Sequence, residues 1–187
     1  MDTIPAPNEI EKIKTENNYL KSFIIKYDIS YPIFTTKLLG ATIGNKSFSL
    51  PKELYNDWKL YKINIYHDER FTTRIEMFYK DKENNSKSYK FGERDGIKES
   101  LEIKDNEVIE NLIINAGDLI DGITIDTNKN SLFGRIKNVG GFGHTFNIKE
   151  ISKIFNKKIE LIGFEGNHDG NHIIQTKAIF KFIDNWL

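Results

Sequence analysis

Short runs of apolar and β-branched residues, separated by glycine, asparagine and aspartate, make up most of the chain beyond its first thirty residues. In one of these runs apolar and polar positions alternate, so that Ile63 and Ile65 share one face of a strand. Ile75, Met77 and Tyr79 do the same in the next run. About twelve such runs occur, at the spacing typical of a sandwich or barrel. The sequence therefore predicts an all-β domain over residues 31–187.

Only two segments of that domain, 50–58 and 147–155, have the pattern of short helical turns. A parallel sheet needs a crossover, usually a helix, between consecutive strands. Because two short helices cannot supply these crossovers, we expect antiparallel sheets.

The first thirty residues follow a helical pattern and form a separate predicted segment, 1–30. Asn8 is a suitable N-cap, with Glu11 three positions later as in a capping box. Steps of three and four residues, as in a heptad seam, join Ile10, Ile13, Asn17, Leu20, Ile24 and Tyr27. Glutamates at g, lysines at e and one asparagine at a favour a parallel two-stranded coiled coil. Two interpretations stay open: a homodimer through this helix, and a single amphipathic helix packed on its own domain.

The composition narrows the range of partners. Lys plus Arg and Asp plus Glu both number 27, so that the formal net charge is zero. A duplex nucleic-acid binder usually carries a basic excess, and we expect no nucleic-acid partner. The absence of cysteine excludes disulfides, thiolate metal sites and thiol catalysis. No signal peptide and no apolar run of about 18 residues is visible, so that we expect a soluble protein, cytoplasmic or non-classically secreted, without a transmembrane segment.

The stretch LIGFEGNHDGNHIIQTKAIF, residues 161–180, places a polar, glycine-containing loop between two apolar runs. His168 and His172 are four residues apart, but in a glycine-punctuated loop, and no other histidine has ligand-like spacing. We therefore expect no metal and no cofactor. Asp-Gly is a common turn pair, so that a plain hairpin turn is one interpretation. The other is a binding loop, because short polar side chains and accessible backbone amides match the hydroxyl groups of sugars.

The usual signatures of catalysis are missing from the sequence. No Gly-x-Ser-x-Gly elbow occurs, and no pair of carboxylates is set apart by apolar surroundings. The glycine-rich VGGFG at 139–143 is not followed by the lysine of a phosphate-binding loop. We therefore expect a binding protein rather than an enzyme.

Two stretches of the chain follow one pattern. GNKSFSL at 44–50 and GHTFNI at 143–148 both lead from glycine through serine or threonine to phenylalanine, a polar residue and an aliphatic residue. Such an echo indicates a fold with internal pseudo-symmetry.

An ordered set of motifs resembles the jacalin-related lectins. The motifs are Glu107-Val108-Ile109, Thr127-Asn128-Lys129, Phe133-Gly134, Thr145-Phe146 and Ile162-Gly163-Phe164-Glu165-Gly166. Upstream, GNKSFSL and YKINIYHDERFTTRIEMFY look like the family's opening glycine loop and first hairpin. The resemblance covers residues 36 to 187, and it depends on the order of the motifs rather than on any one of them.

This resemblance implies a β-prism, in which three four-stranded antiparallel sheets surround a pseudo-threefold axis. It also implies a metal-free sugar site at one end, built from an opening glycine loop, a middle loop and a Gly-x-x-x-Asp loop before the last strand. By position, the expected carbohydrate-binding residues are Gly44, Asn45, Asn115, Asp118, Asp169, Gly170, Asn171, His172 and Gln175.

The sequence departs from the family pattern at the site aspartate. That position falls on Ile174, or on Gln175 if the alignment shifts by one residue, while the middle loop carries no aromatic residue. A charge-assisted hydrogen bond contributes about 1.5–3 kcal/mol, so that its loss would weaken sugar binding. We expect a lectin for neutral glycans. The alternative is a lectin fold that has lost sugar binding and serves as a protein–protein interaction or oligomerisation module.

Overall fold

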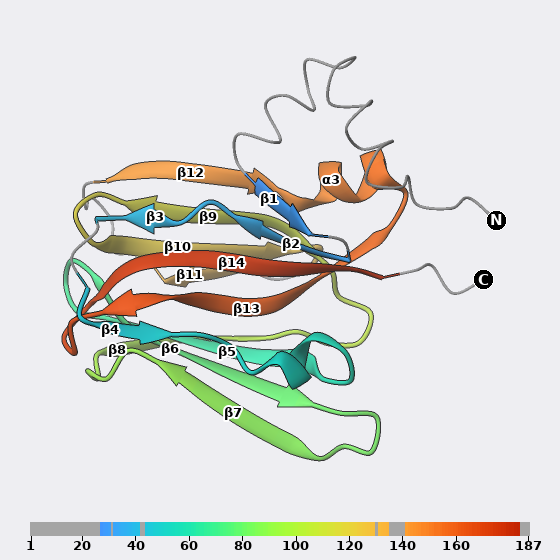
Figure 1. Cartoon of the computed structure of the whole chain (residues 1–187), viewed down its shortest axis with the longest axis horizontal. Coiled ribbons are helices and arrows are strands. Elements are labelled where there is room, and N and C mark those ends of the chain that lie inside the picture. Colours follow the sequence, from blue (N-terminus) through green and yellow to red (C-terminus); the bar gives the residue numbers. More distant parts are fainter. Residues whose placement is uncertain (1–26, 31, 42–43, 130, 135–140, 184–187) are drawn as a thin grey trace.

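The computed structural model describes residues 27–30, 32–41, 44–129, 131–134 and 141–183, with backbone only for 27–30 and 131–134. These residues form three antiparallel sheets (Figure 1). Sheet A holds β1 (Tyr27–Ser30), β2 (Ile33–Thr36), β3 (Leu39–Gly40), β4 (Lys46–Phe48), β13 (Lys158–His168) and β14 (Ile173–Ile183). Sheet B holds β5 (Lys59–His67), β6 (Thr72–Lys80), β7 (Ser86–Phe91) and β8 (Ile97–Glu102). Sheet C holds β9 (Ile109–Ala116), β10 (Ile120–Thr127), β11 (Ser131–Gly134) and β12 (Phe142–Asn147).

Each sheet is built around a central hairpin with one further strand position on either side. In sheet B the order is β7-β6-β5-β8, and in sheet C it is β11-β10-β9-β12. In sheet A, β14 is flanked by β2 and β3, and β13 by β4. This threefold repetition confirms the predicted three-sheet, mostly β architecture. The two echoing stretches contribute β4 and β12, which pair with the first strand of their hairpins.

The prediction of four strands in every sheet is wrong for sheet A, which has six. The position beside β14 is filled by two short strands in succession. Residues 33–35 pair with 179–181, and after a break residues 39–40 pair with 175–176. β1 then adds to the sheet as a hairpin with β2. The helix predicted over 1–30 lies outside the described residues, except that residues 27–30 form β1.

Both short helical turns predicted from the sequence are present, as η1 (Lys52–Tyr55) and α3 (Ile148–Phe155). The helix α3 begins at Asn147, whose side chain accepts a hydrogen bond from Glu150 N, and ends at Asn156 in the left-handed conformation. It buries Ile148 and Ile151 against the domain. Among the described residues, no helix is long and apolar enough to cross a membrane.

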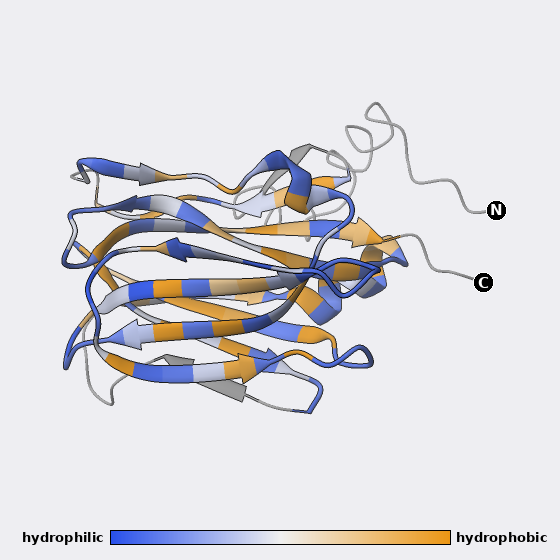
Figure 2. Cartoon of the chain, turned by 90° about the horizontal axis from the view of Figure 1, so that it is seen from below, coloured by the Kyte–Doolittle hydropathy of each residue, from blue (hydrophilic) through white to orange (hydrophobic). Residues whose placement is uncertain are grey.

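One apolar core lies between the three sheets. The alternating residues of the first hairpin, Ile63, Ile65, Ile75, Met77 and Tyr79, are all fully buried, as their spacing predicts. Apolar and polar positions alternate in the same way along other strands (Figure 2). Burial of these side chains supplies the main stabilisation of the fold, at about 1.5–3 kcal/mol for each large residue.

The turns of the three hairpins, 68–71, 117–119 and 169–172, lie at one end of the molecule, on the left in Figure 1. Residues 41 and 44–45, before β4, and the connection 92–96, before β8, reach the same end, because β4 and β8 begin opposite the last residues of β13 and β5. We call these five segments the rim. η1 and α3 lie toward the opposite end (Figure 1).

Candidate functional site

The structure brings the opening loop, the middle loop and the last hairpin together on the rim. Ala41 N donates to Asp118 O over 3.3 Å, which joins the opening loop to the middle loop. Lys46 lies opposite His168 in the β4–β13 register, which joins the opening loop to the last hairpin. Loops that are far apart in the sequence therefore share one surface through backbone pairing.

Glycine lets the opening loop pack directly on the last hairpin. Gly40 has a φ of +102°, and a Cβ there would collide with the carbonyl oxygen of Ile174. A Cβ at Gly44 would collide with the side-chain amide of Asn167. Asn45, the next residue, is exposed. The described part of the loop thus presents the exposed Asn45 side chain beside the hairpin.

The turn of the last hairpin is organised by Asp169. Its Oδ1 accepts from the backbone N–H groups of Asn171 and His172, at 2.7 and 2.8 Å. Partial burial acts to raise the pKa of Asp169, but the hydrogen bonds from His172 and Asn171 outweigh it and lower the pKa overall. Asp169 is therefore ionised at neutral pH, with Oδ1 held by the turn. It is an exposed residue, so that Oδ2 can accept from a ligand hydroxyl.

His168 supports this turn from below. It is buried, and its Nδ1 accepts a hydrogen bond from Gly170 N at 3.2 Å. Burial lowers the pKa of His168 below its ordinary value, which keeps the ring neutral as an acceptor. Lys46 Nζ bonds both carboxylate oxygens of Glu93 at 2.8 and 2.9 Å, next to Gly170. His168, one of the two histidines of this loop, therefore has a hydrogen-bond partner within the turn.

The side chain at position 175 faces the opening loop rather than solvent. Gln175 is 8% exposed, its Oε1 accepts from Asn167 Nδ2 at 2.5 Å, and its Nε2 lies 3.4 Å from Gly40 O. Ile174 is also buried. Neither position at which the family's site aspartate could fall therefore offers a polar group to a ligand. Gln175 is buried and paired with Asn167, and Ile174 is a buried apolar residue.

The middle loop places one predicted residue in solvent and one beneath the surface. Asp118 is exposed, whereas Asn115 is buried and packs beside Gly143 of β12. Phe142, the first residue of β12, pairs with Ala116 at the start of the loop and is 84% exposed. The sequence showed no aromatic residue within the middle loop; β12 supplies one beside it. Only the strand register reveals this neighbour.

A charged cluster holds the last hairpin from the side of sheet B. His172 Nε2 lies 2.9 Å from Asp68 Oδ2, and Arg94 Nη1 lies 3.1 Å from the same oxygen. The Phe71 ring meets the His172 ring edge-on, with 5.4 Å between centroids. Asp68, Arg94 and Phe71 are not among the predicted site residues, because they belong to a different sheet from the last hairpin.

The nine predicted site residues thus divide into three groups. Four are exposed on the rim: Asn45, Asp118, Asp169 and Asn171. Three are partly exposed there: Gly44, Gly170 and His172. Two are buried beneath it: Asn115 and Gln175. The solvent-facing groups are carboxylates, amides and backbone N–H groups, which together can accept from and donate to hydroxyls.

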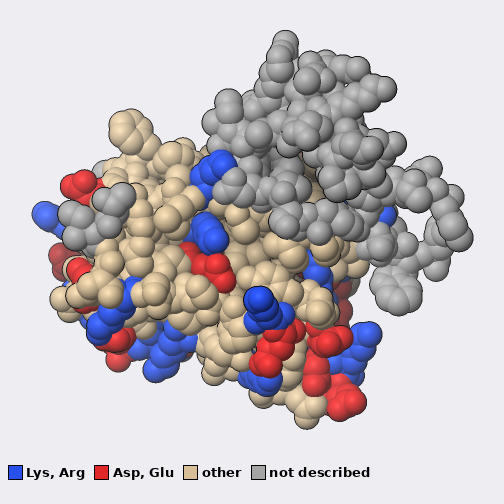
Figure 3. Space-filling model, viewed as in Figure 1, with Lys and Arg blue, Asp and Glu red and all other residues tan. Residues whose placement is uncertain are grey.

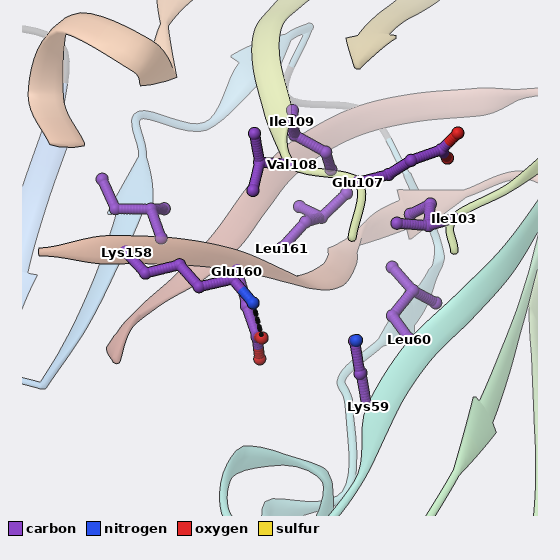
Figure 4. Close-up of a pocket in the computed structure, with 10 residues that line it drawn as sticks. Lys59, Leu60, Ile103, Glu107, Val108, Ile109, Lys158, Glu160 and Leu161 are labelled. Atoms are coloured by element: carbon purple, nitrogen blue, oxygen red, sulfur yellow. Dashed lines mark ion pairs between the residues drawn. The ribbon is translucent and has the colours of Figure 1, made fainter. Parts of the chain in front are cut away.

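Two cavities in the described part of the structure lie away from the rim. The one drawn in Figure 4 lies between Leu60, Ile103 and Leu161 and has about 20 Å³, room for one water. The other is an open groove of about 340 Å³ beside Trp58 and Lys181, lined mostly by charged residues.

Charges of both signs are mixed on one face of the molecule. On the face shown in Figure 3, Lys and Arg side chains are interspersed with Asp and Glu. Among the described residues, no three His, Cys, Asp or Glu side chains are grouped so that they could hold a metal ion.

Three sheets around one core, with a polar surface on the loops at one end, define a protein of the β-prism class. A family model of the jacalin-like lectin domain matches residues 36–176. The chain belongs to the jacalin-like lectin family.

Solved structures show the same fold at low sequence identity. A mannose-binding jacalin-related lectin from Ananas comosus has a TM-score of 0.64 at 13% identity, covering 81% of this chain and 99% of its own. Artocarpin complexed with Me-α-mannose has a TM-score of 0.59 at 16% identity, covering 79% and 96%. A lamprey immune protein has a TM-score of 0.63 at 17% identity, covering 82% of this chain and 45% of its own. No curated protein sequence matches the chain.

Proposed function

We propose that the protein is a non-catalytic lectin that binds neutral glycans at the rim. The observation that carries this proposal is the meeting of the opening loop, the middle loop and the last hairpin on one surface, through the Ala41–Asp118 and Lys46–His168 pairings. Family membership supports it, as do the names of similar structures, which include a mannose-binding lectin and a complex with a biantennary N-glycan.

The groups that would contact a sugar follow from their exposure. Asp118 and Asp169 accept hydrogen bonds from hydroxyls, while the amides of Asn45 and Asn171 both donate and accept. Phe142 offers an exposed ring on which the apolar face of a pyranose can stack. A ligand without charge is favoured, because the surrounding cations and carboxylates already pair with one another.

Asp169 is the residue that we expect to replace the missing family aspartate. The family position is closed here by Ile174 or by the Gln175–Asn167 pair, whereas Asp169 is ionised and exposed in the turn just before it. If its Oδ2 accepts from a hydroxyl, one charge-assisted hydrogen bond of about 1.5–3 kcal/mol is retained.

A glycan array with the intact chain tests the proposal. We expect binding to neutral glycans, and about a tenfold or greater loss for Asp169→Asn, which keeps an oxygen for the turn but removes the charge. Asp105→Asn is the matched control, because it changes an exposed carboxylate on the connection between β8 and β9. This variant should bind as the wild type does. Silence across mannose, galactose and glucose glycans would contradict the proposal and favour the interaction-module alternative.

The oligomeric state bears on the strength of binding. If the heptad pattern over residues 10–24 forms a homodimer, the first of the two interpretations above, two weak sites act together and raise the apparent affinity. Asn17→Leu should change the dimer or its stability in sedimentation; a wild-type chain that sediments as a monomer would contradict this part of the proposal.

A further inference from the structure

The side chain of His172 joins the last hairpin to sheet B. Its Nε2 lies 2.9 Å from Asp68 Oδ2, and the side chains of His172 and Asp68 are only 20% and 23% exposed. The backbone N–H of His172 donates to Asp169 Oδ1 over 2.8 Å. Its ring packs at 77° against that of Phe71, with 5.4 Å between centroids. One residue therefore connects the turn of the proposed sugar site to a hairpin of the neighbouring sheet.

Asp68 is held in one orientation by its own turn. Its Oδ1 accepts from the backbone N–H groups of Arg70 and Phe71, both at 2.8 Å. Its Oδ2 is left for His172 and for Arg94 Nη1, which lies 3.1 Å away. Burial acts to raise the pKa of Asp68, but the hydrogen bonds from its turn and from His172 outweigh it and lower the pKa overall. At neutral pH, Oδ2 is therefore a carboxylate oxygen that can only accept.

This contact determines which ring nitrogen of His172 carries the proton. Two acceptors facing each other at 2.9 Å would repel, so that Nε2 must donate to the Asp68 carboxylate. Arg94 Nη1, 3.3 Å from Nε2, has the same oxygen at the shorter distance of 3.1 Å and donates to it. In the neutral ring, Nδ1 then has no proton and is a hydrogen-bond acceptor.

Nδ1 of His172 is open to a ligand. Among the described residues nothing bonds to it, yet it is not one of the buried polar side-chain atoms that lack a partner, so that it reaches solvent. Nδ1 of His168 differs, because it already accepts from Gly170 N at 3.2 Å. The last hairpin therefore carries an unused acceptor beside Asp169 and Asn171.

We infer that Asp68, through His172, determines how the proposed sugar site hydrogen-bonds its ligand. Asp68 is a positioning residue: it holds the proton of His172 on Nε2, so that Nδ1 accepts from a sugar hydroxyl. This role rests on the proposed lectin function and adds a requirement on the ligand. A sugar must place a donating hydroxyl at Nδ1, and an analogue with a methoxy group there has no proton to donate and binds more weakly.

Nitrogen-15 NMR of the histidine rings reads the tautomer without a ligand. We expect the neutral Nε2–H form of His172 in the wild type. Asp68→Asn keeps an oxygen for its turn but places an amide donor in front of Nε2, so that the proton should move to Nδ1. Asp81→Asn is the matched control, because Asp81 Oδ1 also accepts from two backbone N–H groups of a turn, away from the rim, and should leave His172 unchanged. A wild-type ring with a proton on Nδ1, at the pH of the binding assay, would overturn the inference.

An NMR titration with methyl α-mannoside, and then with methyl α-galactoside, tests the contact with the ligand. We expect Asp68→Asn to weaken binding about three- to tenfold, the range for one lost hydrogen bond. His172→Gln keeps an amide donor for Asp68 but has no acceptor in the place of Nδ1, and should weaken binding to the same extent. The double variant should bind no more weakly than either single variant, because both remove one and the same hydrogen bond. Losses that add in the double variant would show that Asp68 acts through packing alone.

The wild type supplies a test that does not depend on the folding of the variants. The Nδ1 resonance of His172 should move as the sugar is added. A neutral sugar that shifts the amides of Asn45 and Asn171 but not this resonance would overturn the role of Asp68 and His172 and leave the lectin function standing. Neutral sugars that shift none of the three would contradict the proposed function itself, and the role that rests on it.

Discussion

Replacing Gly40 by alanine tests how the opening loop is fixed on the last hairpin. The residue has a φ of +102°, which costs a side chain about 1–2 kcal/mol. The new Cβ would also collide with the carbonyl oxygen of Ile174, so that β3 must move away from β14. Losing one or two ladder hydrogen bonds adds about 1 kcal/mol each. We therefore expect a loss of about 3 kcal/mol in the free energy of unfolding.

Urea and thermal unfolding measure this loss directly. For a chain of this size, about 3 kcal/mol corresponds to a fall of about 6–12 °C in Tm. Gly92→Ala should destabilise by a similar amount, because Gly92 occupies the equivalent place against Thr73. Gly117→Ala is the matched control on the same rim: its Cβ would have ordinary contacts of 3.6 and 3.7 Å, so that we expect a change within about 0.5 kcal/mol. Equal stability of Gly40→Ala and Gly117→Ala would show that the close contact between Gly40 and Ile174 does not limit the stability of the fold.

Three further outcomes follow from individual contacts. The pKa of Asp169 is lowered from its ordinary 3.8, so that its ionised form stabilises the fold above that pH. In urea unfolding, the stability difference between the wild type and Asp169→Asn should therefore shrink as the pH falls below 3.8. Phe142→Ala should weaken glycan binding in calorimetry, because it removes the proposed stacking ring. Its Tm should stay within about 2 °C of the wild type, because the ring is 84% exposed. Ile97→Ala removes another exposed apolar side chain, at 57% exposure, and is the control that should leave binding unchanged. Tyr79→Phe should lower the free energy of unfolding by about 1–3 kcal/mol, since it removes the hydroxyl that donates to Ile162 O at 2.8 Å; an unchanged urea midpoint would contradict this.

The strands were predictable because their pattern is local. Alternation at Ile63, Ile65 and Met77 gives the buried face of the first hairpin directly, and the structure confirms it. The helical turn at 147–155 was equally visible, since Asn147 caps it and Ile148 and Ile151 share one face. The three-sheet architecture followed from the order of motifs, not from any single strand.

The details of the rim were not predictable, because they depend on which strands lie side by side. Nothing in the sequence near the middle loop shows that Phe142 pairs with Ala116, or that Asn115 is buried beneath β12. Gln175 is polar and lies in a strand, but its burial depends on Asn167 and on the opening loop above it. The extra strands of sheet A were not predictable either. The position beside β14 is divided between β2 and β3, and the apolar pattern of the sequence does not show where one ends and the other begins.

We propose that a neutral glycan binds the loops of the rim and not the interior of the prism. A crystal structure of the chain with the neutral glycan that binds most strongly on the array would show where the sugar lies. We expect a sugar within hydrogen-bond distance of Asp169 and of at least one of Asn45, Asp118 and Asn171. A sugar bound in the groove beside Trp58, or anywhere else away from these loops, would contradict it.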